Sequence, residues 1–452
     1  MAGDFLHIII LTGISLVLYY FTTKTTLKNS LLLLTSLLFY YMLEGEKIAI
    51  LAIIILISFF TGKLLHTTNY KKYILFSGIA INVLLLLSHK YILSIYPYHK
   101  PSLPIGLSFY TFQSISYIID MCRKKDGASY SFVETATFIA FFPKLLAGPL
   151  ERIDSFIHEL KKTHSYNKKR TFTAFKIILY ALTCKFVFAD KIGMYVDGSL
   201  SDYSSLSAIN ILITAALFSF QIFFDFYAYS ILAIGIARLY GIKLSYNFNY
   251  PYFSTSLYDF WKRWNITLTF WFRDYIYIPL GGNRVSTLRW AVNVMIVFII
   301  SGIWHGATFN FLLWGFFHGL LYITERYVYR RLPVYYKQNS LLKCLYSCIV
   351  FVLLSLLWLL FRADNHLMLS TLSGQLLSDW RWGVTSAMIL WLIASMSIIL
   401  IFRKYRLSEK YIFQTKENFS FIGKEICLIN AMIILLFSFS ASGNSSFIYF
   451  KF

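Results

Sequence analysis

Long apolar runs dominate the sequence of 452 residues, and they limit the folds open to it more than any other feature. A helix needs about 20 apolar residues to cross the hydrocarbon core of a bilayer. Stretches near that length occupy residues 5–22, 29–43, 47–65, 73–95, 172–190, 206–240, 288–304, 307–329, 341–361, 384–402 and 424–441. We therefore predict an all-α polytopic membrane protein with about eleven transmembrane helices, the first of them a retained span rather than a removed signal peptide.

The composition agrees with a bilayer as the solvent. Hydrophobic residues make up 58% of the chain and charged residues 14%, against roughly 25% charged residues in an ordinary globular domain. The 42 Lys and Arg exceed the 21 Asp and Glu, as expected where short cytoplasmic loops collect basic residues. No nucleic-acid-binding motif accompanies them, and the five cysteines show no metal-ligand spacing. We expect neither a nucleic-acid partner nor a metal.

Two apolar regions, residues 103–121 and 132–150, are interrupted by prolines and glycines, among them Pro104, Pro143 and Pro149. Broken backbone at membrane depth is tolerated only where it is packed in protein or lines a wet cavity. We expect re-entrant or kinked elements around a central funnel. Ordinary proline-kinked spans remain the alternative.

The segment 257–287 differs from the spans because its aromatic residues alternate with Arg and Lys. This pattern is typical of an amphipathic segment whose rings lie at the headgroup level. The sequence shows no internal repeat and no long linker. We predict a single membrane-embedded domain over residues 1–452.

His305 is the first candidate for chemistry. It lies in a run from Val292 to Phe317 that contains no Lys, Arg, Asp or Glu. Gly302 and Gly306 flank it and leave space for another backbone or an acyl chain to approach. Ionisable residues in membrane spans are costly and often functional. Desolvation favours the neutral imidazole, the form that a general base requires. The alternative is a histidine that only bonds to a neighbouring helix.

Other polar residues lie near the spans. His318 follows thirteen residues after His305 (318 − 305), which places it about 220° further around a continuous helix and so on another face. It supports the site or makes a structural hydrogen bond. Gln221 and Asp225, four residues apart, line a cavity or bond to each other and to a neighbouring helix. Asn265 is a candidate to donate its amide to a developing oxyanion, the kind of fixed dipole that stabilises acyl transfer.

No motif of a serine hydrolase, P-loop NTPase, dinucleotide-binding enzyme or HExxH metalloprotease is present. Other recognisable motifs occupy residues 104–123, 141–152, 220–226, 259–284, 301–319, 359–363 and 447–452. Together these runs resemble the membrane-bound O-acyltransferase family, in its bacterial branch of alginate and peptidoglycan O-acetylation.

The resemblance implies a helical bundle with a funnel and with His305, in the WHG run, at its narrowest point as the catalytic residue. Asn265 stands where bacterial relatives often have a histidine after RW, and His318 matches a second recurrent histidine. Ala228 and Ile231 replace a Gly and an Asp of the family pattern. The LGGNR ending at residues 280–284 favours acetyl over D-alanyl as the group carried.

The implied function is O-acetylation of a glycan outside the bacterial inner membrane, with acetyl-CoA as the cytoplasmic donor and no bound cofactor. The acceptor would be an alginate-like polymer, peptidoglycan, lipopolysaccharide or capsule, reached alone or through an extracytoplasmic partner acetyltransferase. The alternatives are D-alanyl transfer to teichoic acid and a transporter without chemistry. The sequence lacks the repeats and paired intramembrane charges that would favour a transporter.

Overall fold

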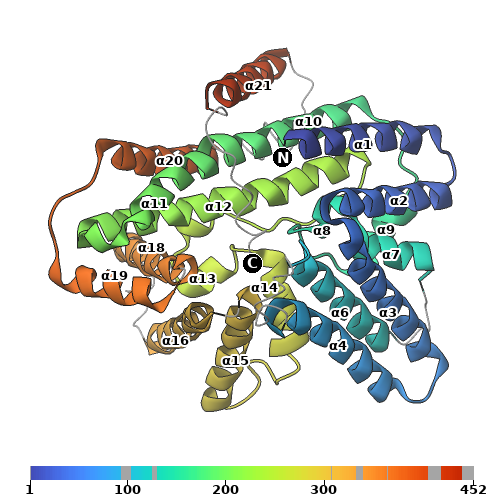
Figure 1. Cartoon of the computed structure of the whole chain (residues 1–452), viewed down its shortest axis with the longest axis horizontal. Coiled ribbons are helices and arrows are strands. Elements are labelled where there is room, and N and C mark those ends of the chain that lie inside the picture. Colours follow the sequence, from blue (N-terminus) through green and yellow to red (C-terminus); the bar gives the residue numbers. More distant parts are fainter. Residues whose placement is uncertain are drawn as a thin grey trace. The chain divides into compact units, whose positions relative to one another are not determined.

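The computed structural model describes residues 2–92, 103–124, 130–306, 308–331, 339–363, 365–405 and 419–439, and within these ranges it contains helices and no strand. Figure 1 shows their order along the chain. The first half contains α1 (Ala2–Phe21), α2 (Thr25–Glu44), α3 (Ile48–Thr67), α4 (Lys71–Leu87), α6 (Leu107–Arg123), α7 (Phe132–Ala140), α8 (Phe142–Leu145), α9 (Ile153–Lys161), α10 (Lys168–Thr183), α11 (Asp190–Ser201) and α12 (Ala208–Leu239). The second half contains α13 (Leu257–Trp261), α14 (Ile266–Phe272), α15 (Thr287–His305), α16 (Phe309–Arg331), α18 (Ser340–Arg362), α19 (His366–Ser378), α20 (Ser386–Tyr405) and α21 (Phe419–Phe439).

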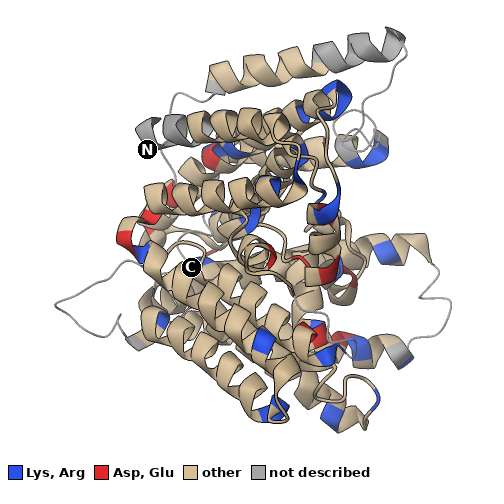
Figure 2. Cartoon of the chain, turned by 90° about the vertical axis from the view of Figure 1, so that its right-hand side faces the viewer, with Lys and Arg blue, Asp and Glu red and all other residues tan. Residues whose placement is uncertain are grey.

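The helical prediction is confirmed, because each apolar stretch expected to span the bilayer contains a helix. Long parts of these helices carry no Lys, Arg, Asp or Glu (Figure 2). Six stretches in the described part are long and apolar enough to cross a membrane: Thr25–Thr67, Lys71–Tyr91, Lys168–Ser201, Ala208–Leu239, Thr287–His305 and Ser340–Arg362. Shorter apolar helices occupy Ile10–Phe21, Ser386–Ile401 and Leu428–Ser438. The chain is a multi-pass membrane protein.

The stretch 206–240 forms one continuous helix, α12, of 32 residues. At 1.5 Å per residue it is about 48 Å long, which exceeds the hydrocarbon thickness of about 30 Å. It joins two compact units of the chain, unit 1 (Met1–Ile178 and Ser230–Tyr246) and unit 2 (Leu179–Tyr229 and Asn247–Phe452). The single domain over 1–452 stays a prediction.

In unit 1 the two interrupted regions behave differently. The first forms the uninterrupted helix α6, and its glycine and proline precede the helix: Gly106 has φ 79°, and a Cβ there would lie 2.8 Å from the carbonyl oxygen of Leu145. The second region is broken, because α7 ends at Ala140 and α8 begins at Phe142 with a proline in its first turn. The funnel and the membrane depth of both regions stay predictions.

A buried lysine stabilises this break. The Nζ of Lys144 donates to the carbonyl oxygen of Phe138 at 2.7 Å, in the last turn of α7, and to the Oε1 of Gln113 at 3.0 Å. A side-chain donor near a helix C-terminus satisfies carbonyls that have no partner within the helix. The break is therefore packed inside protein, as backbone of this kind requires.

In unit 2 the helices α15 and α16 form an antiparallel hairpin with an unusually close backbone contact. A Cβ at Gly302 would collide with the carbonyl oxygen of Phe311, and one at Gly315 with the carbonyl oxygen of Phe298. Each would also lie 3.4 Å from the Cα of the other glycine. Small residues allow membrane helices to approach in this way. The expectation that Gly302 leaves room for another backbone is confirmed.

We predict that Gly302→Ala destabilises the hairpin, because its methyl group must displace backbone of α16. Overpacking of this kind costs about 1–3 kcal/mol, and the thermal unfolding temperature of the purified protein in detergent should fall by several degrees. Gly374→Ala in α19 is the matched control, because a Cβ there meets nothing within 4 Å. An unchanged unfolding temperature for Gly302→Ala would contradict the contact.

Candidate functional site

His305 is the last residue of α15 and lies among aromatic rings. The helix begins at the Ser286 cap and ends at His305 because Gly306 is extended, and the ring of Phe311 fills the space that a side chain at Gly306 would need. His305 is 5% exposed. Its ring centroid lies 4.9 Å from that of Phe361 and 5.1 Å from that of Trp314, in both cases edge to face.

His318 lies in the middle of α16 and is also surrounded by aromatic rings. Its centroid lies 4.6 Å from that of Trp314, 5.1 Å from that of Trp261 and 6.1 Å from that of Phe298. Trp358 of α18 completes the surroundings at 6.3 Å. We call His305, His318, Trp261, Trp314, Trp358 and Phe361 the aromatic cluster.

The structure brings the two histidines into this one cluster from different helices. His305 and His318 do not lie on one continuous helix, because the chain turns back between α15 and α16. Trp314 contacts both imidazole rings. The sequence therefore identified two members of the cluster and missed the indoles between and around them.

Asn265 follows directly after Trp264, a residue that contacts the cluster. Trp264 packs on Trp358 with centroids 5.0 Å apart. Asn265 itself precedes α14 with φ 41°, a left-handed conformation that Asn adopts more readily than most residues. Its side chain is buried, and the amide oxygen has no hydrogen-bond partner among the described residues. A polar group held in this way is oriented by the backbone rather than by a bonding partner.

The segment around Asn265 is held by its own charges. Arg273 Nε donates to Asp274 at 2.6 Å, and Arg263 Nε donates to Asp259 at 2.9 Å. The segment contains α13, α14 and a π-helical turn over Arg273–Tyr277. Its position at the membrane surface stays a prediction.

A second buried polar group lies elsewhere in unit 2. The Nζ of Lys185 lies 2.8 Å from a carboxylate oxygen of Asp190 and 2.7 Å from one of Asp225. Asp225 therefore bonds to a neighbouring segment, as one of the two interpretations of Gln221 and Asp225 predicted. The amide of Gln221 lies against Gly193 and does not bond to Asp225. Lys185 belongs to the π-helix Cys184–Ala189. The expectation that the spans contain no paired charges is therefore wrong for Lys185 and Asp225. A lysine inside the apolar stretch 172–190 was the signal in the sequence.

The hairpin and α18 define two ends in unit 2. Asn310 donates to the carbonyl oxygen of Ala363 at 2.7 Å, and Tyr346 donates to Glu325 at 2.8 Å. These contacts make α16 and α18 antiparallel. We call the end with Gly306 and Ala363 the histidine end, and the opposite end the basic end.

Charge differs between these ends. The basic end collects the terminal turns that contain Arg289 of α15, Arg326, Arg330 and Arg331 of α16, and Lys343 of α18. At the histidine end the same helices contribute Arg362, which pairs with Asp197 at 2.8 Å. Basic residues are therefore segregated to one end of these helices.

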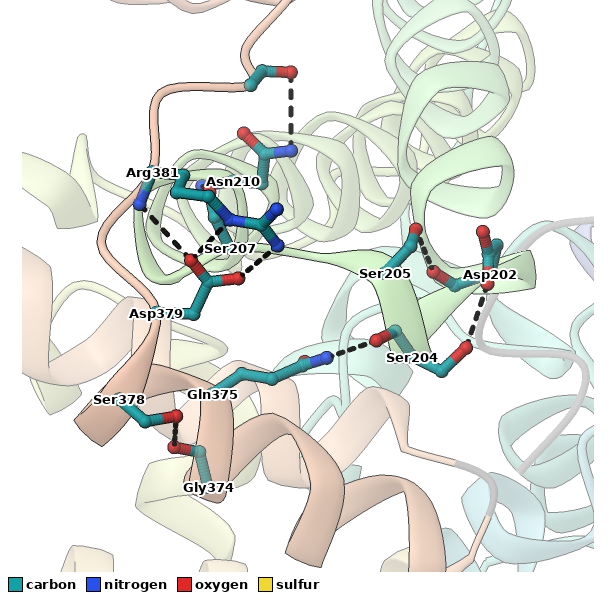
Figure 3. A network of polar contacts seen from close by, with 11 residues as sticks. Asp202, Ser204, Ser205, Ser207, Asn210, Gly374, Gln375, Ser378, Asp379 and Arg381 are labelled. Carbon is teal, nitrogen blue, oxygen red and sulfur yellow. Dashed lines mark hydrogen bonds and ion pairs between the residues drawn. The ribbon is translucent and has the colours of Figure 1, made fainter.

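A polar network fixes the connection between α19 and α20 to the start of α12 (Figure 3). The backbone N–H of Ala208 donates to the carbonyl oxygen of Asp379 at 2.6 Å, and Gln375 donates to the carbonyl oxygen of Ser204. Hydrogen bonds from Arg381 hold the pKa of the Asp379 carboxyl below its ordinary value. Because these charges pair with each other, the network is a structural clamp.

The chain matches a family model and is similar to several known proteins. The family model "MBOAT, membrane-bound O-acyltransferase family" matches residues 19–362. The chain is 38% identical over 269 residues to the "Probable alginate O-acetylase" of Pseudomonas aeruginosa, covering 58% of this chain and 49% of that one. It is 33% identical over 352 residues to the peptidoglycan O-acetyltransferase of Helicobacter pylori, covering 69% and 66%.

A more distant relative has another acyl group in its name. The chain is 29% identical over 241 residues to the teichoic acid D-alanyltransferase of Bacillus subtilis, covering 50% of this chain and 60% of that one. The chain thus spans about half to two thirds of the length of these curated relatives. The matched family range includes His305, His318 and Asn265.

Proposed function

Because the chain belongs to the membrane-bound O-acyltransferase family, we propose that it is an enzyme that acetylates hydroxyl groups of a glycan outside the bacterial inner membrane. The observation that carries the proposal is His305, a buried imidazole at the end of an apolar helix. Burying an ionisable side chain in a membrane span costs free energy, so residues of this kind are usually functional.

The chemistry follows from the groups at hand. His305 takes the proton of the acceptor hydroxyl as a general base, and the oxygen attacks the acetyl carbonyl of the donor, for which we propose acetyl-CoA. The C–O bond forms while the thioester C–S bond breaks, and the proton passes to the leaving thiolate. His305 can instead accept the acetyl group transiently and pass it to the acceptor. Asn265 donates its amide to the oxyanion.

Acetyl is the group that the relatives favour. Identity is 38% and 33% to relatives named for O-acetylation, against 29% to one named for D-alanyl transfer. We propose an alginate-like polymer or peptidoglycan as the final acceptor, which the acetyl group reaches either directly or through an extracytoplasmic partner acetyltransferase.

The charge distribution of unit 2 supports an orientation for this reaction. Membrane proteins keep short Lys- and Arg-rich segments in the cytoplasm. The basic end then faces the cytoplasm and the histidine end faces outward. In this orientation His305 lies on the side of the glycan acceptor, and the acetyl group moves outward from its cytoplasmic donor.

We expect His305→Ala to abolish glycan acetylation, with a loss of at least about 10²-fold, because general-base catalysis contributes that much. The measurement is the acetate released by mild base from surface glycans of cells that carry only the variant, normalised to the amount of protein in the membrane. His158→Ala, at an exposed position of α9, is the control and should acetylate normally. Acetylation by His305→Ala would sink the mechanism and favour a transporter.

Asn265→Gly tests the oxyanion donor without straining the backbone, because glycine adopts the left-handed conformation freely. Loss of one oxyanion donor typically lowers kcat by roughly 10²–10³-fold, and we expect a loss of this size with labelled acetyl-CoA in membrane vesicles. The thermal unfolding temperature should stay within a few degrees of that of the wild type. Full activity of the variant would remove Asn265 from the mechanism.

The orientation predicts which side of the membrane each end of unit 2 faces. In a variant without its natural cysteines, Leu367→Cys lies in the exposed first turn of α19 at the histidine end, and Lys343→Cys lies at the exposed basic end. A membrane-impermeant maleimide added to intact cells should label position 367 and not position 343. The reverse pattern would contradict the orientation, and labelling after lysis provides the control for reactivity.

A further inference from the structure

His318 has the surroundings of a packed aromatic side chain. It is 1% exposed, and the rings of Trp314 and Trp261 meet it nearly edge to face at interplanar angles of 63° and 76°. The ring of Phe298 stacks on it at 10°. Aromatic pairs prefer these two arrangements. The surrounding aromatic rings therefore fix the position of the imidazole ring from several sides.

The two ring nitrogens of His318 take no part in conventional hydrogen bonding. Both are buried and have no hydrogen-bond partner among the described residues, and the same is true of the indole nitrogens of Trp261 and Trp314. Edge-to-face packing lets such N–H groups point at aromatic faces. A proton carrier must come within hydrogen-bond reach of the proton that it moves. The burial of both nitrogens opposes that role for His318.

Trp314 connects His318 to His305, the candidate base, by direct ring contacts. Trp314 is itself 1% exposed and lies 4.6 Å from His318 and 5.1 Å from His305, measured between ring centroids. All three side chains come from the α15–α16 hairpin. A change in the shape of residue 318 therefore reaches His305 through a closely packed indole.

We propose that His318 is a positioning residue, whose ring fixes Trp314 and through it the orientation of the His305 imidazole, and that it does not transfer protons. This inference rests on the proposed function of His305. It assigns to the two histidines different tasks: His305 reacts, and the ring at 318 holds the reacting ring in place. A misplacement of about 1 Å can cost 10²-fold in rate.

Two substitutions separate ring shape from hydrogen bonding. His318→Phe keeps an aromatic ring without nitrogens, and His318→Gln keeps polar atoms without a ring. In membrane vesicles with labelled acetyl-CoA, we expect His318→Phe to keep at least about half of the wild-type kcat and an unchanged pH profile, since a hydrophobic swap of similar shape is tolerated. His318→Gln should lose at least about tenfold in kcat with little change in KM, because the reacting ring is misplaced.

The proposal is overturned if His318→Phe is as inactive as His305→Ala while its membrane level and unfolding temperature match the wild type, or if His318→Gln is fully active. If His318→Phe does not accumulate, Trp314→Phe decides: a kcat several-fold lower supports positioning, and wild-type kcat overturns it. Failure of the proposed function itself appears separately, as acetylation that persists in His305→Ala.

Discussion

The close contact between the backbones of α15 and α16 at Gly302 and Gly315 is the constraint on which the rest of the site depends. Apolar surface alone does not drive helices together in lipid, so contacts between small residues contribute much of the association. This contact turns the chain back directly after His305 and lays Trp314 against the imidazole. Without it the two histidines would lie far apart along one apolar run.

Much of the fold could be predicted from the sequence, since a bilayer demands long apolar helices and the sequence displays their lengths directly. The break after Ala140 followed from the proline at position 143. The start of α6 did not, because Pro104 and Gly106 serve to begin the helix instead of bending it. Proline and glycine mark a discontinuity without telling which side of it continues as helix.

Only part of the candidate site could be predicted from the sequence. His305 stood out because it interrupts a long uncharged run, whereas Trp261, Trp314 and Trp358 come from three separate helices. In a chain with 19% aromatic residues no pattern distinguishes three tryptophans that will surround a histidine. The same holds for Lys185, whose two carboxylate partners become recognisable only once α11 and α12 are packed. Contacts between distant helices decide these features, and spacing along one helix cannot reveal them.

In the proposed mechanism an acetyl group enters from the cytoplasmic side and leaves on a glycan at the other side. Sealed inverted vesicles, with labelled acetyl-CoA outside and the acceptor glycan enclosed, would reveal this transfer. We expect base-labile label on the enclosed glycan, protected from an added esterase until the vesicles are opened. Label that the esterase removes from sealed vesicles, or no label on the glycan at all, would contradict transfer across the membrane.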